Sequence, residues 1–180
     1  MMTEQERKNK FALLMEQHIG LLETSCLVNG LDQMGYFTAP ASANHHGNYE
    51  GGLFDHSWAV MESLVDLTEK LQLKWDREAS PYLVGLLHDI CKCGAYSYNK
   101  ETKSWEYNKD IIMTGHGELS VILAQQLIEL TPEEILCIRW HMGAYDDKEN
   151  WNILGRAIEY YPNVLYTHTA DMIASRIKGV

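Results

Sequence analysis

Histidine and aspartate residues recur along the chain at long, similar intervals, and this pattern constrains the fold more than any other feature. The series consists of His56, the adjacent pair His88 and Asp89, then His116, His141 and Asp171. Successive members lie roughly 25 to 32 residues apart, about the length of one helix–loop–helix passage. Imidazole and carboxylate groups are ligands of transition-metal and mixed nitrogen–oxygen sites. The series therefore indicates a metal centre assembled inside a helical bundle.

The size and charge of the chain limit its possible partners. Its 180 residues fit one domain, residues 1–180, and the 46% of hydrophobic residues can form a core. The formal net charge is −10, which argues against a long nucleic acid because that affinity depends on cationic contacts with phosphates. A small anionic substrate is compatible with this charge, since bound divalent cations reverse the local sign.

Four cysteines, Cys26, Cys91, Cys93 and Cys137, bear on the cellular location. Cys91 and Cys93 do not have the spacing of a CxxC redox or zinc motif. We interpret all four as buried, reduced thiols of a cytoplasmic protein. No apolar run reaches the ~18 residues of a membrane span, and the N-terminus lacks the apolar region of a signal peptide. We therefore expect a cytoplasmic location and no membrane partner.

Helical periodicity and capping signals predict an all-α bundle. Thr3 and Glu6 form a capping-box pattern that opens a helix or helix pair ending near Gly35. A polar, glycine-rich loop follows at 38–52. A helix with Asp76 as N-cap and Pro81 near its start leads into the His88–Asp89 pair. Other helices are expected over approximately 53–71, 117–130, 132–142, 152–160 and 163–178.

One segment departs from the helical pattern. Between about residues 95 and 108, aromatic residues flank a polar turn. Alternating aromatic residues around a short polar turn are typical of two paired strands. We predict a small β-hairpin inserted into the helical bundle.

The sequence around the ligand series resembles the HD-domain superfamily of metal-dependent phosphohydrolases. The resemblance is carried by three segments, Gly51–Ser57, Leu86–Lys92 and Thr169–Ser175, and extends over about residues 45–176. It implies an HD-domain helical bundle in which 45–176 form the metal-binding core and 1–35 form an N-terminal helical segment.

The same resemblance implies the ligands and the cofactor. His56, His88, Asp89 and Asp171 would hold one metal. Asp89 would bridge to a second ion held by His116 and His141, as in the dinuclear branch of the superfamily, and a carboxylate with two oxygens can form such a bridge. The implied cofactors are two divalent ions, drawn from Mn, Fe, Mg, Co, Ni and Zn.

The implied activity is hydrolysis of a nucleotide or other small phosphate ester through a metal-activated water. Asp89 and Lys92 are the expected catalytic residues. Lys92, His46 in the loop before the first ligand, and Arg139 are the expected substrate contacts. Arg156 and Arg176 are further candidates for a guanidinium that binds phosphate.

Three other functions remain open at this point. Some dinuclear HD proteins are di-iron oxygenases, and they use the same order of ligands. A 3'–5' exonuclease-like phosphodiesterase is compatible with the ligands but less so with the net charge. A metal-stabilised binding module would need the ligands but no reaction, although open coordination positions favour catalysis.

Overall fold

The computed structural model describes residues 2–44, 47–108, 110–111 and 115–180. These residues form eight α-helices and one two-stranded sheet, with short 3-10 and π-helical segments. The α-helices are α1 (Glu4–Ile19), α2 (Leu21–Gln33), α3 (Gly52–Leu71), α4 (Ser80–Leu87), α5 (His116–Gln125), α6 (Pro132–Arg139), α7 (Trp151–Tyr160) and α8 (Asn163–Met172). The strands are β1 (Tyr96–Asn99) and β2 (Ser104–Tyr107).

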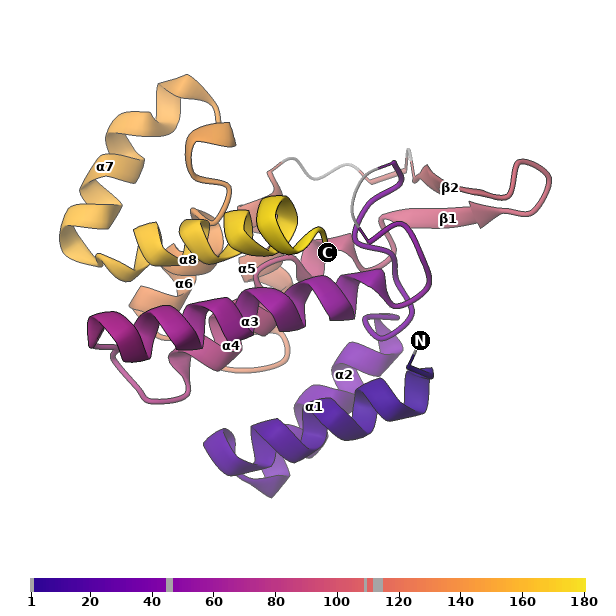
Figure 1. The fold of residues 1–180 in the computed structure, drawn as a ribbon, viewed down its shortest axis with the longest axis horizontal. Helices are drawn as coiled ribbons and strands as arrows, with labels where there is room; N and C mark the ends of the chain where they lie inside the picture. Colours follow the sequence, from indigo (N-terminus) through magenta and orange to yellow (C-terminus); the bar gives the residue numbers. More distant parts are fainter. Residues whose placement is uncertain (1, 45–46, 109, 112–114) are drawn as a thin grey trace.

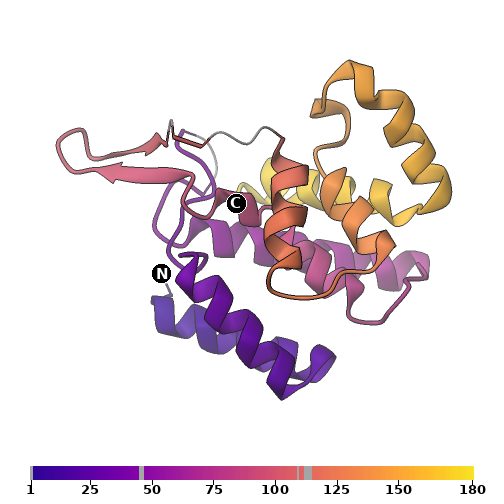
Figure 2. The same cartoon turned by 180° about the vertical axis from the view of Figure 1, so that it is seen from behind.

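The predicted all-α bundle with one β-hairpin is confirmed. Helices α3, α4, α6 and α8 pack together in the body of the molecule. The α1–α2 pair lies along one side, and the hairpin projects from the end opposite α7 (Figure 1; Figure 2 shows the reverse side). Helix α8 continues as the π-helix η4 (Ile173–Lys178).

The N-terminal helix pair is joined to the body by an aromatic cluster. Thr3 and Glu6 form both hydrogen bonds of the predicted capping box, and Gly20 separates α1 from α2 at φ 85°. Phe11 of α1 packs edge-on against Tyr36 and Phe37. These rings are almost fully buried, so the pair shares the hydrophobic core of the bundle.

Two glycines let the helices that carry the site approach closely. A Cβ on Gly85 would lie 2.4 Å from the Met61 backbone, so α4 packs against α3 only with glycine there. A Cβ on Gly117 would lie 2.0 Å from the Arg139 carbonyl oxygen, which sets the approach of α5 to the end of α6. Both glycines lie within three residues of a predicted ligand, so these contacts help to set the spacing of the site.

The hairpin has one aromatic face. Tyr96 pairs with Tyr107, and Tyr98 pairs with Trp105. Because side chains alternate across a strand, all four rings lie on the same face. The Tyr98 and Tyr107 rings are about half exposed, at 49% and 53%.

Three expectations from the sequence were wrong in detail. Helix α4 begins at Ser80, and the backbone N–H of Asp76 instead donates to the Glu133 carboxylate at 2.8 Å, a contact between distant segments. Helix α5 ends at Gln125 rather than near 130, because the residues after Gln125 form a turn instead of continuing the helix. All four cysteines are free thiols, but Cys26 is exposed and Cys93 is only partly buried.

No helix in the described ranges has the length and apolarity needed to cross a membrane.

Candidate metal centre

The six predicted ligands all lie at or near helix ends. His56 lies just past the first turn of α3, His88 is the C-cap of α4, and Asp89 precedes the 3-10 helix η1 (Ile90–Lys92). His116 opens α5, His141 lies just past α6, and Asp171 is in the last turn of α8. Helix packing brings these ends together, although they are far apart in the sequence.

His56, His88 and Asp171 form the closed half of the centre. The His56 Nε2 atom lies 3.3 Å from the His88 Nε2 atom and 3.3 Å from a carboxylate oxygen of Asp171. The ligand atoms of the three residues all lie within 4.8 Å of one another. Both imidazoles are almost completely buried. Two ring nitrogens and a carboxylate that converge in a buried place are a donor set suited to a divalent cation.

Backbone carbonyls orient three of the histidine rings. The His88 Nδ1 atom lies 2.9 Å from the Gly85 carbonyl oxygen, and the His141 Nδ1 atom lies 2.7 Å from that of Ile138. The His56 Nδ1 atom lies 2.9 Å from the backbone oxygen of Val180. A neutral ring that donates through Nδ1 keeps a lone pair on Nε2. The three Nε2 atoms therefore face the centre as metal ligands would, and such carbonyl partners accompany metal-binding histidines.

Asp89 lies between the two halves of the centre. One carboxylate oxygen is 3.4 Å from the His88 Nε2 atom, and the other is 3.4 Å from the His141 Nε2 atom. Lys92 pairs with the same carboxylate at 2.5 Å. Although burial alone would raise the pKa of Asp89, the Lys92 ammonium and neighbouring histidines hold it well below its usual range. The carboxylate is therefore ionised, as metal binding requires.

Asp171 and His56 shift each other's pKa. Burial opposes the charge on both groups, but their hydrogen bond lowers the pKa of Asp171 to about 2. The hydrogen bonds to Asp171 and Asp89 raise the pKa of His56 to about 9. A bound cation would replace the imidazole proton as the positive partner of these carboxylates.

Cys91 and His116 form the open half of the centre. The Cys91 Sγ atom lies 3.4 Å from the His116 Nδ1 atom, and the ligand atoms of both lie within 4.8 Å of a carboxylate oxygen of Asp89. His116 is exposed, whereas Cys91 is buried. Burial raises the pKa of the Cys91 thiol to about 12 and lowers the pKa of His116.

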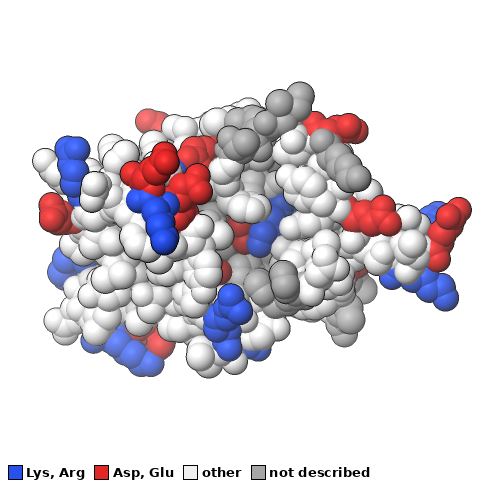
Figure 3. Space-filling model, turned by 90° about the horizontal axis from the view of Figure 1, so that it is seen from above, with Lys and Arg blue, Asp and Glu red and all other residues white. Residues whose placement is uncertain are grey.

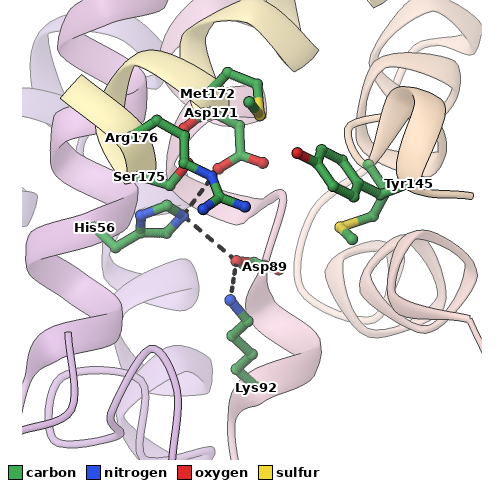
Figure 4. Close-up of a pocket in the computed structure, with 9 residues that line it drawn as sticks. His56, Asp89, Lys92, Tyr145, Asp171, Met172, Ser175 and Arg176 are labelled. Carbon is green, nitrogen blue, oxygen red and sulfur yellow. Dashed lines mark hydrogen bonds and ion pairs between the residues drawn. The ribbon is translucent and has the colours of Figure 1, made fainter. Parts of the chain in front are cut away.

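A cavity of about 420 Å³ opens beside the carboxylates (Figure 4). Its lining residues are His56, Asp89, Lys92, Met142, Tyr145, Asp171, Met172, Ser175 and Arg176. The Arg176 side chain extends over Asp171 and has no ion-pair partner in the described part of the chain. Seen from above, basic and acidic atoms meet in a hollow near the middle of this face (Figure 3). The cavity thus combines two cations with carboxylates able to hold metal.

Of the three predicted substrate contacts, Lys92 is the one that the structure describes at the cavity. Lys92 lines the cavity. Arg139 does not line it, and its guanidinium instead pairs with Glu118 and, at 2.6 Å, with Asp146. His46 lies outside the described residues.

The sequence did not single out three residues that the fold brings to the centre. Cys91 was interpreted as a structural thiol, although it lies two residues from Asp89. Tyr145 lies four residues after His141, a spacing that could have drawn attention to it. The Val180 carbonyl gave no signal at all, because a backbone atom has no sequence signature.

Comparison with known proteins assigns the family. The sequence matches the HD domain family over residues 53–174, and the chain belongs to that family. It is 30% identical, over 107 residues, to the dihydroneopterin 2',3'-cyclic phosphate phosphodiesterase of Methanocaldococcus jannaschii. The aligned region covers 58% of this chain but only 39% of that relative. No solved structure matches this chain.

Proposed function

We propose that this protein is a metal-dependent phosphohydrolase that acts on a small phosphate ester. The observation that supports this most strongly is the convergence of six donor residues from separate helix ends beside a cavity that contains Lys92 and Arg176. A phosphate ester brings negative charge, and cations next to a metal centre can neutralise it.

In the proposed centre, His56, His88, Asp89 and Asp171 would hold one divalent ion, and Asp89, His116 and His141 would hold a second. When bound, such ions lower the pKa of an attacking water and withdraw charge from the phosphoryl oxygens. The protein keeps both carboxylates ionised and fixes the buried rings through backbone carbonyls. These features hold the donor atoms ready without a large rearrangement.

Lys92 and Arg176 are the proposed phosphate contacts. Lys92 is anchored by Asp89 at 2.5 Å, so its ammonium is held beside the bridging carboxylate. Arg176 reaches the cavity from η4 and offers a planar set of donors suited to two phosphate oxygens. Arg139 remains a predicted contact that the geometry does not favour, because Glu118 and Asp146 already bind it.

A nucleotide or a similar ester with a ring system is the proposed substrate. The volume of about 420 Å³ is in the range of small-molecule sites. The relative from M. jannaschii is named for a cyclic phosphate of a pterin, which also joins a phosphate to a flat heterocycle. The net charge of −10 makes a long nucleic acid the weaker proposal.

The test is phosphate release or ester opening in a panel of nucleoside monophosphates, 2',3'-cyclic phosphates and short single-stranded RNA. Metal-free protein is supplied with one divalent ion at a time, without dioxygen. We expect turnover of a small ester that depends on the added ion and is lost in Asp89→Asn. Asp66→Asn, a change to an exposed carboxylate on α3, should retain it.

Three outcomes would replace the proposal. Substrate-dependent oxygen uptake with a mixed-valent iron signal in electron paramagnetic resonance would establish the oxygenase alternative. A preference for RNA over every small ester would establish the exonuclease-like alternative. Metal binding without turnover of any panel member would leave the binding module as the better description.

A further inference from the structure

Cys91 occupies a position in the centre that the proposed ligand set does not use. Its sulfur lies 3.4 Å from the His116 Nδ1 atom, and both atoms lie within 4.8 Å of an Asp89 carboxylate oxygen. The three groups come from two segments, the chain around η1 and the start of α5. They therefore form a cluster through tertiary packing, not through sequence proximity alone.

The spacing of the sulfur and the nitrogen suits a shared ion. Divalent zinc binds a thiolate at about 2.3 Å and an imidazole nitrogen at about 2.0–2.1 Å. At a tetrahedral angle, these bonds separate the two ligand atoms by about 3.5–3.6 Å. The observed 3.4 Å is close to that value, so coordination requires little movement of either side chain. With Asp89, the cluster offers three protein ligands, and His141, the other proposed ligand of this ion, would complete a set of four.

A second observation points to a ligand on the same carboxylate. His141 is fully buried, and no hydrogen-bond partner of its Nε2 atom occurs among the described residues. That atom lies 3.4 Å from the Oδ1 atom of Asp89. Buried ring nitrogens normally have a partner, because leaving one unsatisfied is costly. A cation beside Asp89 would satisfy it.

We propose that Cys91 binds a metal ion as a thiolate, together with Asp89 and His116. Coordination forms a metal–sulfur bond and breaks the S–H bond, and the proton leaves to solvent. The inference rests on the proposed metal centre but not on phosphate hydrolysis. A sulfur ligand makes this half of the centre selective for zinc, cobalt or ferrous iron over magnesium and manganese.

The experiment is a titration of metal-free protein with Co²⁺ in the absence of dioxygen, followed by absorption spectroscopy. We expect a sulfur-to-cobalt charge-transfer band in the near ultraviolet, together with the weaker visible bands of bound cobalt. Cys91→Ser and His116→Ala should lose or greatly weaken the charge-transfer band. Cys93→Ser, a change two residues away, should retain it.

A competition between Zn²⁺ and Mn²⁺ gives a second readout. The preference for Zn²⁺ should fall by at least about tenfold in Cys91→Ser and should be unchanged in Cys93→Ser. If Cys91→Ser does not fold, single substitutions of Cys26, Cys93 and Cys137 identify the ligand by elimination. Retention of the band in all three assigns it to Cys91.

The possible results separate the inference from the proposed function. Visible cobalt bands without a charge-transfer band would mean that the centre binds metal but Cys91 contributes only a hydrogen bond to His116. A charge-transfer band that survives in Cys91→Ser would equally overturn the inference. Failure of cobalt to bind at all would remove both this inference and the metal centre, whereas a normal thiolate band in a protein inactive on phosphate esters would remove only the proposed function.

Discussion

The two halves of the candidate centre are built in different ways. In the closed half, His56 and His88 are buried and their rings are oriented by carbonyl oxygens. In the open half, His116 is exposed and its Nδ1 atom faces the sulfur of Cys91 instead of a carbonyl, whereas His141 is buried and oriented by the Ile138 carbonyl. The closed half is thus rigid before an ion arrives, whereas the open half can adjust to the ion and the substrate. Asp89 contacts both halves, which makes it the most sensitive point of the comparison.

The largest effect is expected from Asp89→Ala. Because one carboxylate lies between the halves, its loss should reduce metal content in both and lower kcat/KM by at least about 100-fold. Metal analysis and steady-state kinetics, with Asp66→Asn as the matched control, test this. Two full equivalents of metal in Asp89→Ala would show that the halves do not share this ligand.

The second-largest effect should distinguish the halves directly. His88→Ala removes a buried, hydrogen-bonded ring, and the metal-free protein should lose about 2–4 kcal/mol of unfolding free energy. His116→Ala alters an exposed ring and should change that free energy by no more than about 0.5 kcal/mol while removing one equivalent of metal. Urea unfolding and metal analysis of both variants give the comparison. Equal destabilisation, or loss of all metal from His116→Ala, would contradict the division into two halves. His141→Ala should likewise lose one equivalent and retain the other.

The third prediction concerns the two arginines. Arg176→Ala should raise KM about tenfold with a smaller change in kcat, because a guanidinium that contacts a non-reacting phosphate oxygen contributes uniform binding. Arg139→Ala should instead lower the unfolding free energy by about 1–3 kcal/mol, since it removes the guanidinium that pairs with Glu118 and Asp146. Kinetics and urea unfolding separate these effects, and Arg156→Ala is the control. A KM effect in Arg139→Ala larger than in Arg176→Ala would restore Arg139 as the phosphate contact.

The smallest effect is expected at the carbonyl that orients His56. Gly179 has φ 74°, and a Cβ there would meet no atom within 4 Å, so the main effect expected of Gly179→Val is strain in the backbone. The displaced Val180 carbonyl should free the His56 ring and weaken zinc binding in the closed half by up to about tenfold. Zinc titration and nitrogen chemical shifts of the His56 ring measure this. Gly155→Ala, in an equally open position, is the control, and an unchanged His56 tautomer in Gly179→Val would refute the role of the carbonyl.

The sequence alone predicted much of this protein because its strongest signals are local. Capping at Thr3, Pro132 at the start of α6 and the aromatic alternation of the hairpin depend on neighbouring residues, and these predictions are confirmed. The sequence also predicted the ligand series, since imidazole and carboxylate have few alternative uses in that order and context, and metal binding by these residues stays a prediction. The assignment of each ligand to an ion stays a prediction.

Tertiary structure decided which further groups meet the ligands. Gly85 and Gly117 permit the close helix contacts that bring distant segments together, and no local pattern reports the distance that results. The same packing engages Arg139 with two carboxylates and leaves Arg176 at the cavity. The sequence therefore determined the elements and the kinds of donor, because these depend on short-range spacing. Packing decided that Cys91 faces His116 and that Val180 orients His56, because those contacts join residues 25 and 124 positions apart.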